Sequence, residues 1–316
     1  GVYVADEKPP EPMERVIQAR LDWVADKVKS ARIPVIPVGM AGVDLTGYGR
    51  ELLAPRGLHV TNGLNYALGA IGHAIRWQER HGQVRAVERP QIATRTVTTS
   101  GPWSEAQARD LLAAEGVPVV PGELVNSADE AAAAAARLGL PVVLKICSAQ
   151  ITHKSDIGGV ALRLDSEAAV RAAYERVRAA GDRVAGATVE GVLVLPMRSG
   201  GLELLAGVTV DPTFGPVLAV GLGGVWVEIL RDTALRPLPV DPAGVKEMLR
   251  GLRGFPLLEG ARGSAPADLD AVAAAITGIG NTALSLGDSL GALEVNPLWV
   301  NGNQVEALDV LVVTEP

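Results

Sequence analysis

The sequence predicts an α/β protein of two domains. Short apolar runs typical of strands alternate with segments whose apolar residues recur at helical spacing. The chain has 316 residues, 48% of them apolar, which is more than one hydrophobic core of ordinary size holds. Residues 83–101 show little periodicity and carry charge, a proline and a run of threonine and serine, so we place the boundary there, with domains at 1–90 and 91–316.

The pattern of apolar residues in 1–90 predicts an α/β segment that forms one half of a doubly wound domain. Val16, Leu21, Val24 and Val28 share one face of the first expected helix. Because no earlier strands precede these elements, we expect a sheet edge that another segment must cover. In chain order we expect a helix at 12–30, a strand at 33–38, a glycine-punctuated loop at 39–49, a strand at 58–61 and a helix at 66–78.

Residues 91–316 predict a longer series of elements. Ser104 is a suitable N-cap because Gln107 follows three residues later. The turn-rich pentapeptide at 211–215 and Asn301-Gly302 each lie between apolar runs and predict antiparallel hairpins. We expect helices at 104–114, 128–138, 167–180, 243–249 and 269–285, and strands at 117–120, 141–146, 191–195, 202–210, 217–220, 290–295, 299–300 and 305–313.

Composition excludes several classes of function. The net charge is −7, and no basic stripe with interleaved aromatic residues occurs, so binding to nucleic acid is not expected. No run approaches the roughly 20 apolar residues that span a bilayer, and residues 1–16 lack the features of a secretory signal, so no membrane partner is expected. Cys147 is the single cysteine, which excludes an intrachain disulfide and favours a cytoplasmic location.

One short stretch, residues 145–160 (KICSAQITHKSDIGGV), combines three features suited to phosphate chemistry. Lys145 ends an apolar strand and can act as a point charge on phosphate oxygens. The neutral imidazole of His153 can attack phosphorus, and Gly158 and Gly159 let backbone N–H groups approach an anion closely. The plainer interpretations are a strand-end lysine that faces solvent and a surface loop histidine.

Five blocks occur in order along the second domain: LPVVLKICSAQITHKSDIGGVALRL, EGVLVLPM, ELLAGVTVDPTFGPVLAVGLGGVWVEILRD, FPLLEGARG and LEVNPLWV. Together they resemble the ATP-grasp part of the acyl-CoA synthetases that form a nucleoside diphosphate, which are relatives of succinyl-CoA synthetase. The resemblance implies an ATP-grasp fold of two α+β subdomains, at about 100–190 and 191–316. Residues 1–90 resemble, less specifically, the end of the family's flavodoxin-like CoA-ligase domain.

The resemblance assigns the phosphate-handling roles. Lys145 would contact the nucleotide phosphates, and His153 would take phosphate from ATP and pass it to a second histidine in the CoA-ligase half. The turn at Gly158-Gly159 would hold the transferring group. Lys154 and Asp156 are either supporting charges or solvated loop residues.

The resemblance also implies nucleotide and metal contacts further along the chain. Leu195 and Met197 would belong to the segment that recognises adenine through backbone groups, with the choice between adenine and guanine left open. Glu203 would contact the ribose or the metal, or is an ordinary strand-edge glutamate. Asn296 and Asp309 would be the Mg²⁺ ligands, although Asn296 before a proline also reads as a turn residue.

Three further features have weaker assignments. The segment Gly221–Gly224, with Glu228, Arg231 and Asp232, either lines the site or forms a tight turn. Cys147 shares a strand face with Lys145, and we interpret it as a small core residue. Nothing in residues 1–90 matches the family's second phosphohistidine motif, because His73 between Gly72 and Ala74 sits in the middle of an expected helix.

We therefore expect the ATP-grasp part of an ADP-forming acyl-CoA synthetase, which converts acid, ATP and CoA into acyl-CoA, ADP and phosphate. The implied cofactors are ATP, Mg²⁺ and CoA, the last bound mainly outside this chain. The implied partners are a small carboxylic acid and the CoA-ligase half with the second phosphohistidine, on an upstream segment or a separate chain, in an oligomer. Two alternatives stay open: an ATP-grasp ligase that joins a carboxylate to an amine, and a non-catalytic nucleotide- or acyl-CoA-sensing module of a protein acetyltransferase.

Overall fold

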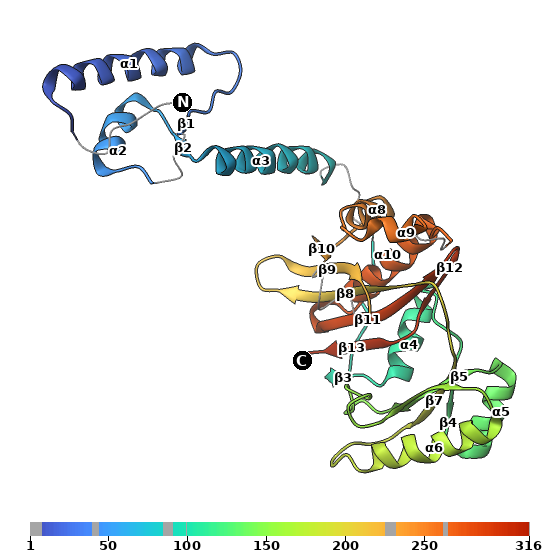
Figure 1. The fold of residues 1–316 in the computed structure, drawn as a ribbon. Helices are drawn as coiled ribbons and strands as arrows, with labels where there is room; N and C mark the ends of the chain where they lie inside the picture. The colour runs from blue at the N-terminus through green and yellow to red at the C-terminus, as the bar shows by residue number, and fades with distance from the viewer. Residues whose placement is uncertain are drawn as a thin grey trace. The chain divides into compact units, whose positions relative to one another are not determined.

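The computed structural model describes residues 8–39, 44–84, 91–98, 100–224, 232–261 and 265–315. The chain divides into two compact units, Gly1–Glu88 and Arg89–Pro316, called here the N-terminal and C-terminal units (Figure 1). None of the helices in the described ranges combines the length and apolar character that crossing a bilayer needs.

The described part of the N-terminal unit contains three α-helices and a two-stranded parallel sheet. Its small core is formed by buried side chains from α1 and α2 and by Leu58. β1 pairs with β2 in parallel, and α2 lies between them along the chain. Its elements are α1 (Glu11–Ser30), β1 (Val38–Gly39), α2 (Gly47–Leu53), the 3-10 turn η1 (Ala54–Arg56), β2 (Thr61–Asn62) and α3 (Leu64–Val84).

Several expectations for this unit were wrong in extent. The strand expected at 58–61 lies at Thr61–Asn62, and the helix expected at 66–78 runs over Leu64–Val84. The strand expected at 33–38 is reduced to Val38–Gly39, because Pro34 and Pro37 have no N–H to donate to a ladder. The loop expected at 39–49 ends in α2, where Thr46 caps the helix by accepting a hydrogen bond from the Gly49 N–H.

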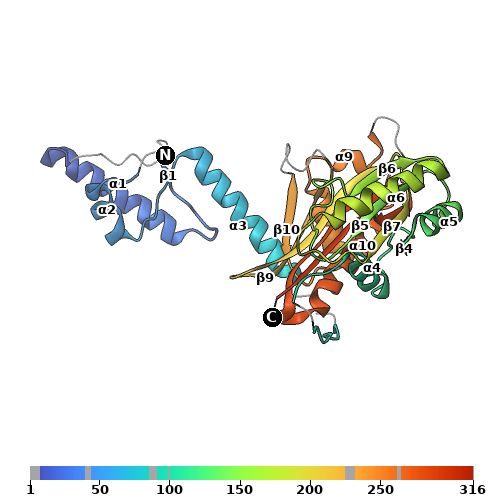
Figure 2. The same ribbon diagram turned by 90° about the horizontal axis from the view of Figure 1, so that it is seen from below.

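In the C-terminal unit, one sheet is small and fully antiparallel, with the order β4-β7-β5-β6. Its strands are β4 (Glu123–Val125), β5 (Val142–Cys147), β6 (Val160–Leu164) and β7 (Gly191–Pro196). Two helices, α5 (Ala128–Leu138) and α6 (Glu167–Asp182), pack together on this small sheet, as Figure 2 shows. All residues of β5 and β7 are buried, which agrees with the continuous apolar runs read from the sequence.

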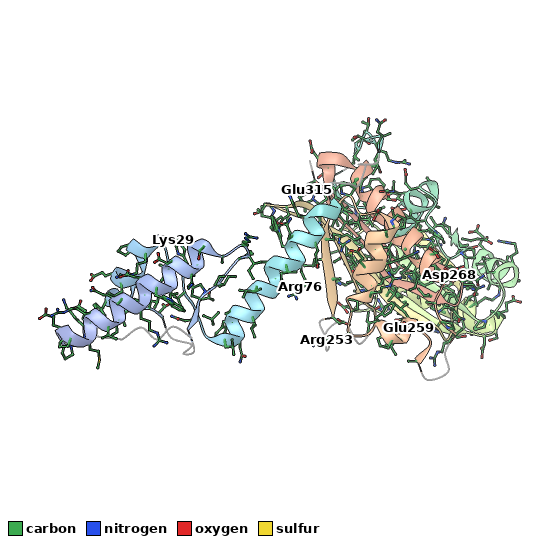
Figure 3. The ribbon with its side chains drawn as sticks, turned by 90° about the horizontal axis from the view of Figure 1, so that it is seen from above. Lys29, Arg76, Arg253, Glu259, Asp268 and Glu315 are labelled. Carbon is green, nitrogen blue, oxygen red and sulfur yellow. The ribbon has the colours of Figure 1, made fainter. Side chains whose placement is uncertain are left out.

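The second sheet of this unit, the large sheet, has the order β10-β9-β8-β11-β13-β3, and β12 pairs with β11. Helices α4, α8 and α10 enclose with it the largest core of the protein (Figure 1). Asp268, labelled in Figure 3, caps α10 by accepting hydrogen bonds from the N–H groups of Asp270 and Ala271. The strands are β3 (Gly101–Pro102), β8 (Leu202–Asp211), β9 (Gly215–Leu222), β10 (Thr233–Pro237), β11 (Leu290–Asn301), β12 (Gln304–Ala307) and β13 (Val310–Thr314). The helices are α4 (Glu105–Ala114), α8 (Pro242–Arg250), α9 (Phe255–Leu258) and α10 (Leu269–Ser285), followed by the 3-10 turn η3 (Gly287–Ser289).

Several predictions are confirmed in this unit. The capping box of Ser104 and Gln107 starts α4, and both hairpins form, with Asp211 paired to Gly215 and Asn301 to Gln304.

The strand expected at 117–120 was wrong, because only Val119 forms an isolated bridge there and the strand begins later, at β4. The strands β3, β6 and β10 were not predicted.

Two differences at the C-terminal end shape the candidate site. The sequence predicted a break at residues 296–298, but β11 runs through it with a register shift between Val295 and Leu298, so Asn296 lies on a bulge within a strand. The sequence also predicted one strand over 305–313, but β12 ends at Ala307 and β13 begins at Val310. Asp309 therefore lies in a gap between two strands.

Candidate functional site

Lys145 lies in the buried strand β5, and its ammonium group is fully engaged within the protein. Its Nζ donates to Asp309 Oδ2 at 2.7 Å, to the Leu308 carbonyl at 2.9 Å and to Glu105 Oε1 at 3.1 Å. The side chain is only 10% exposed. The interpretation as a strand-end lysine facing solvent was therefore wrong. Lys145 instead contacts one of the two expected metal ligands directly.

Lys154, in the loop after β5, makes a second set of ion pairs with the same two carboxylates. Its Nζ lies 2.8 Å from Glu105 Oε2 and 3.3 Å from Asp309 Oδ1. The two lysines come from the small sheet and its loop, whereas Asp309 comes from the gap between β12 and β13 of the large sheet and Glu105 from the helix α4. We call these four residues, Glu105, Lys145, Lys154 and Asp309, the charge cluster.

The charges of the cluster stabilise one another. Burial alone would raise the pKa of Asp309, but Lys145 and Lys154 outweigh this and lower the pKa. Burial alone would lower the pKa of Lys154, but Glu105 and Asp309 raise it. Asp309 is therefore held as an anion and Lys154 as a cation.

His153 lies on the exposed loop between β5 and β6 and lines a cavity of about 410 Å³. One wall is formed by this loop, and the other by β11, β13 and the gap between β12 and β13. Most of the lining is polar, which suits an anionic ligand better than an apolar one. The lining residues are Thr152, His153, Lys154, Ser155, Asp156, Val160, Glu294, Asn296, Asp309 and Leu311.

Gly158 and Gly159 play a different part from the one expected. The Gly158 N–H donates to the Ser155 carbonyl at 3.1 Å, and the Gly159 N–H donates to the Lys154 carbonyl at 2.8 Å. Both donors are therefore used inside the loop and do not form an open anion-binding turn, which corrects that expectation. Gly158 has a φ of +75°, so these glycines close the loop that presents His153 and Lys154.

We expect Gly159→Ala to destabilise this loop. A Cβ at Gly159 would lie 2.6 Å from Ile146 Cγ2 and 2.9 Å from the Lys154 carbonyl oxygen, so the loop must shift, at a cost of about 1–3 kcal/mol in the free energy of unfolding. Denaturant unfolding of the variant measures this cost. Gly207→Ala is the control, because its nearest contact would be 3.4 Å and it should change stability by less than about 0.5–1 kcal/mol. Equal stability of the two variants would contradict the prediction.

The cavity contains oxygen donors suited to Mg²⁺. Glu294 and Asn296 lie two residues apart on β11, with Asn296 Nδ2 donating to Glu294 Oε1 at 3.2 Å, and the Asn296 N–H donates to the Asp309 carbonyl. The part of the chain that the structure describes has no cluster of three or more His, Cys, Asp or Glu side chains that could hold a metal. Two carboxylates and an amide nevertheless fit Mg²⁺, which keeps several waters and shares its shell with phosphates.

Sequence reasoning left Glu294 out of the metal set and did not find Glu105 at all. Glu294 could have been found, because residues two apart on a strand face the same side and Asn296 was already assigned. Glu105 carries no local signal. It follows the cap Ser104 in the first turn of a helix, where an acidic residue is ordinary.

The residues expected to contact the nucleoside lie next to this cavity but do not line it. Leu195 is buried with Val120 and Val143, and Met197, Val160 and Leu308 pack against this cluster. Val160 also lines the cavity, so the apolar cluster and the cavity adjoin. The Met197 N–H donates to the Pro141 carbonyl at 2.9 Å and is engaged within the protein.

Glu203 lies exposed on β8, opposite Trp299 of β11. Its carbonyl accepts a hydrogen bond from the Gly223 N–H at 2.7 Å, and a Cβ at Gly224 would lie 2.8 Å from Glu203 Oε2. The segment that contains Gly223 and Gly224 therefore approaches Glu203 closely. The structure does not bring this carboxylate into the His153 cavity.

Glu228 and Arg231 lie outside the described residues. Asp232 accepts hydrogen bonds from the N–H groups of Arg253 and Gly254, which is a structural role. Cys147 is a buried core residue, as predicted, and burial raises the pKa of its thiol. His73 is exposed on α3, and its Nδ1 lies 3.2 Å from an Arg76 nitrogen.

Comparison with known proteins gives a consistent set of relatives. A family model described as an ATP-grasp domain matches residues 98–314. Subunit beta of acetate–CoA ligase [ADP-forming] I from Pyrococcus furiosus is 32% identical over 230 residues, which are 72% of this chain and 99% of the relative. Acetate–CoA ligase [ADP-forming] I from Archaeoglobus fulgidus is 36% identical over 210 residues, which are 66% of this chain and 30% of that longer protein.

A solved structure shares the fold. It is the dinucleotide-forming acetyl-coenzyme A synthetase 1 of Ca. Korarchaeum cryptofilum, in complex with coenzyme A, Ca-AMPCP and HgCl+. The TM-score is 0.64 at 34% identity, over 68% of this chain and 94% of that chain. These similarities confirm the ATP-grasp fold that the sequence blocks predicted.

Proposed function

The chain belongs to the ATP-grasp family of the ADP-forming acetyl-CoA synthetases and resembles their beta subunits, and from this premise we propose that His153 accepts the γ-phosphoryl group of ATP during activation of a carboxylic acid. One observation carries the proposal. His153 lines the same cavity as Glu294, Asn296 and Asp309, with Lys154 beside it. A nucleophile, hard oxygen donors and a cation thus surround one space of a size suited to a phosphate chain.

The proposed step is an in-line displacement at phosphorus. A ring nitrogen of neutral His153 forms a bond to the γ-phosphorus, the bond from that phosphorus to the β,γ-bridging oxygen breaks, and ADP leaves with the electron pair. The nitrogen that does not react keeps its proton, and the product is phosphohistidine and ADP. The phosphoryl group on the histidine is the one later used to form the acyl-CoA.

The residues around His153 act by position and charge. Bound Mg²⁺ would neutralise charge on the phosphates, and Glu294, Asn296 and Asp309 are the residues that would hold it. Lys154 lines the cavity and supplies a fixed positive charge. Lys145 does not line the cavity, so we assign it to the support of Asp309.

We propose that the CoA-dependent half of the reaction requires a partner. The family match is confined to residues 98–314, so the N-terminal unit lies outside it. The parallel β1-β2 pair supports the proposal that this unit is the end of a flavodoxin-like CoA-ligase domain. The partner would supply the rest of that domain, most of the CoA site and the second phosphohistidine.

Labelling tests the proposal. The wild-type chain, mixed with ATP labelled in the γ-phosphate and with Mg²⁺, is expected to become labelled without any carboxylic acid or CoA. The label should be lost in acid and kept in base, because phosphohistidine has that stability and phosphoserine does not. An ATP-grasp ligase that forms an acyl phosphate would need the acid before any phosphate is transferred, so absence of label without acid would contradict the proposal.

A further inference from the structure

Glu105 is the most deeply buried member of the charge cluster and has no role in the reaction described above. Its side chain is 1% exposed, compared with 10% for Lys145, 12% for Lys154 and 33% for Asp309. It does not line the cavity. One carboxylate oxygen contacts each lysine, at 3.1 Å and 2.8 Å, and the second contact lacks directed hydrogen-bond geometry.

A buried carboxylate is needed in this position because Lys145 and Lys154 require a negatively charged partner both with and without bound metal. A buried ammonium group without a counter-ion is strongly unfavourable. Asp309 pairs with both lysines in this structure, but as a metal ligand it would share its charge with Mg²⁺. Glu105 would then be the carboxylate that stays with Lys145 and Lys154.

Arg109 lies one helical turn after Glu105 and increases the need for a buried negative charge. It is buried, it donates through Nη2 to the Val120 carbonyl, and its Nη1 has no hydrogen-bond partner in the described structure. Burial lowers the pKa of Arg109, and the charge of Glu105 opposes that effect. Arg109 therefore adds a buried positive charge near the two ion-paired lysines, and of the two carboxylates in the cluster Glu105 is the one that lies away from the cavity.

We propose that Glu105 is a positioning residue, the resident counter-ion that lets Asp309 leave its lysines for the metal. This inference rests on the proposed function, because it concerns how metal binding at the same site is controlled. Without the Glu105 charge, Asp309 is the single carboxylate that pairs with both lysines, so it is held more tightly and Mg²⁺ must compete harder. The extra positive charge should at the same time favour an anion that binds without metal.

The test is the Mg²⁺ dependence of nucleotide binding in Glu105→Gln, measured by calorimetry on the full chain with a nonhydrolysable ATP analogue. We expect the half-saturating Mg²⁺ concentration to rise about tenfold or more, a coupling typical of residues in one charge network. ADP measured in EDTA should bind at least as tightly as it does to the wild type. A purely structural role would weaken both measurements together.

Glu167→Gln is the matched control. Glu167 also follows a serine cap in the first turn of a helix and has an arginine four residues later, but it is exposed and pairs with Arg171 on the surface. It should leave both measurements unchanged. Glu105→Gln/Lys154→Gln removes one charge of each sign, so it folds more readily, and it still leaves Asp309 as the only carboxylate beside Lys145. It should show a rise in the Mg²⁺ requirement that is smaller than in Glu105→Gln, because Asp309 then pairs with one lysine instead of two. Metal-free ADP binding is compared in Glu105→Gln alone, because Lys154 itself lines the cavity.

The outcomes separate the two proposals. Unchanged Mg²⁺ dependence in the folded variants, or a joint loss of Mg²⁺-dependent and metal-free binding, would overturn the role of Glu105 and leave the phosphohistidine unaffected. A wild-type chain that binds nucleotide but takes up no label would overturn the role of His153 and leave the Glu105 test valid. A wild-type chain that binds no nucleotide would overturn both.

Discussion

His153→Ala is expected to take up no label from γ-labelled ATP above background. The reason is chemical, because the variant lacks the nitrogen to which phosphorus would be bonded. The imidazole is exposed, so its removal should leave folding intact. Quantifying acid-labile, base-stable label on the purified chain measures the effect.

Another exposed histidine provides the control for this experiment. The chain has four histidines, and His73 lies exposed on α3 in the N-terminal unit, beside Arg76. His73→Ala should take up as much label as the wild type. Label retained in His153→Ala with unchanged chemical stability would place the phosphate on another residue and would remove the basis of the proposed mechanism.

Lys145→Met is expected to lower the free energy of unfolding of the C-terminal unit by about 3 kcal/mol, within the range for breaking a buried ion pair by removing one partner. The change removes the ammonium group that contacts Glu105 and Asp309 and leaves both carboxylates with Lys154 alone. Methionine fills most of the same volume, so the loss reports charge and not packing. Denaturant unfolding followed by circular dichroism measures it.

A surface lysine gives the comparison. Lys246 pairs with Asp270, which is 86% exposed, and Lys246→Met should therefore cost less than about 1 kcal/mol. If the two methionine variants were equally stable, the charge cluster would contribute nothing specific to the fold. The support that Lys145 is proposed to give to Asp309 would then lose its energetic basis.

The elements that were predicted correctly are those whose signals are local. The capping box at Ser104 and the hairpin at Asn301 depend on residues within a few positions of each other, and both form as expected. The strand β6 was missed because its five residues do not alternate cleanly, with Leu162 exposed and Arg163 at a φ of +57°. The gap that presents Asp309 was missed because apolar residues continue across it.

The sequence by itself determined the family, the ATP-grasp fold and the chemical types gathered in one stretch, a lysine, a histidine and two glycines within 145–160, because these depend on order along the chain. Only the tertiary structure decided that Lys145 contacts Asp309, 164 residues away, and Glu105, 40 residues away. Backbone propensities act over a few residues, whereas these ion pairs exist only where the small sheet, the large sheet and α4 meet. The buried carboxylate of Glu105 was therefore invisible in the sequence, whereas His153 could be identified there as the candidate nucleophile.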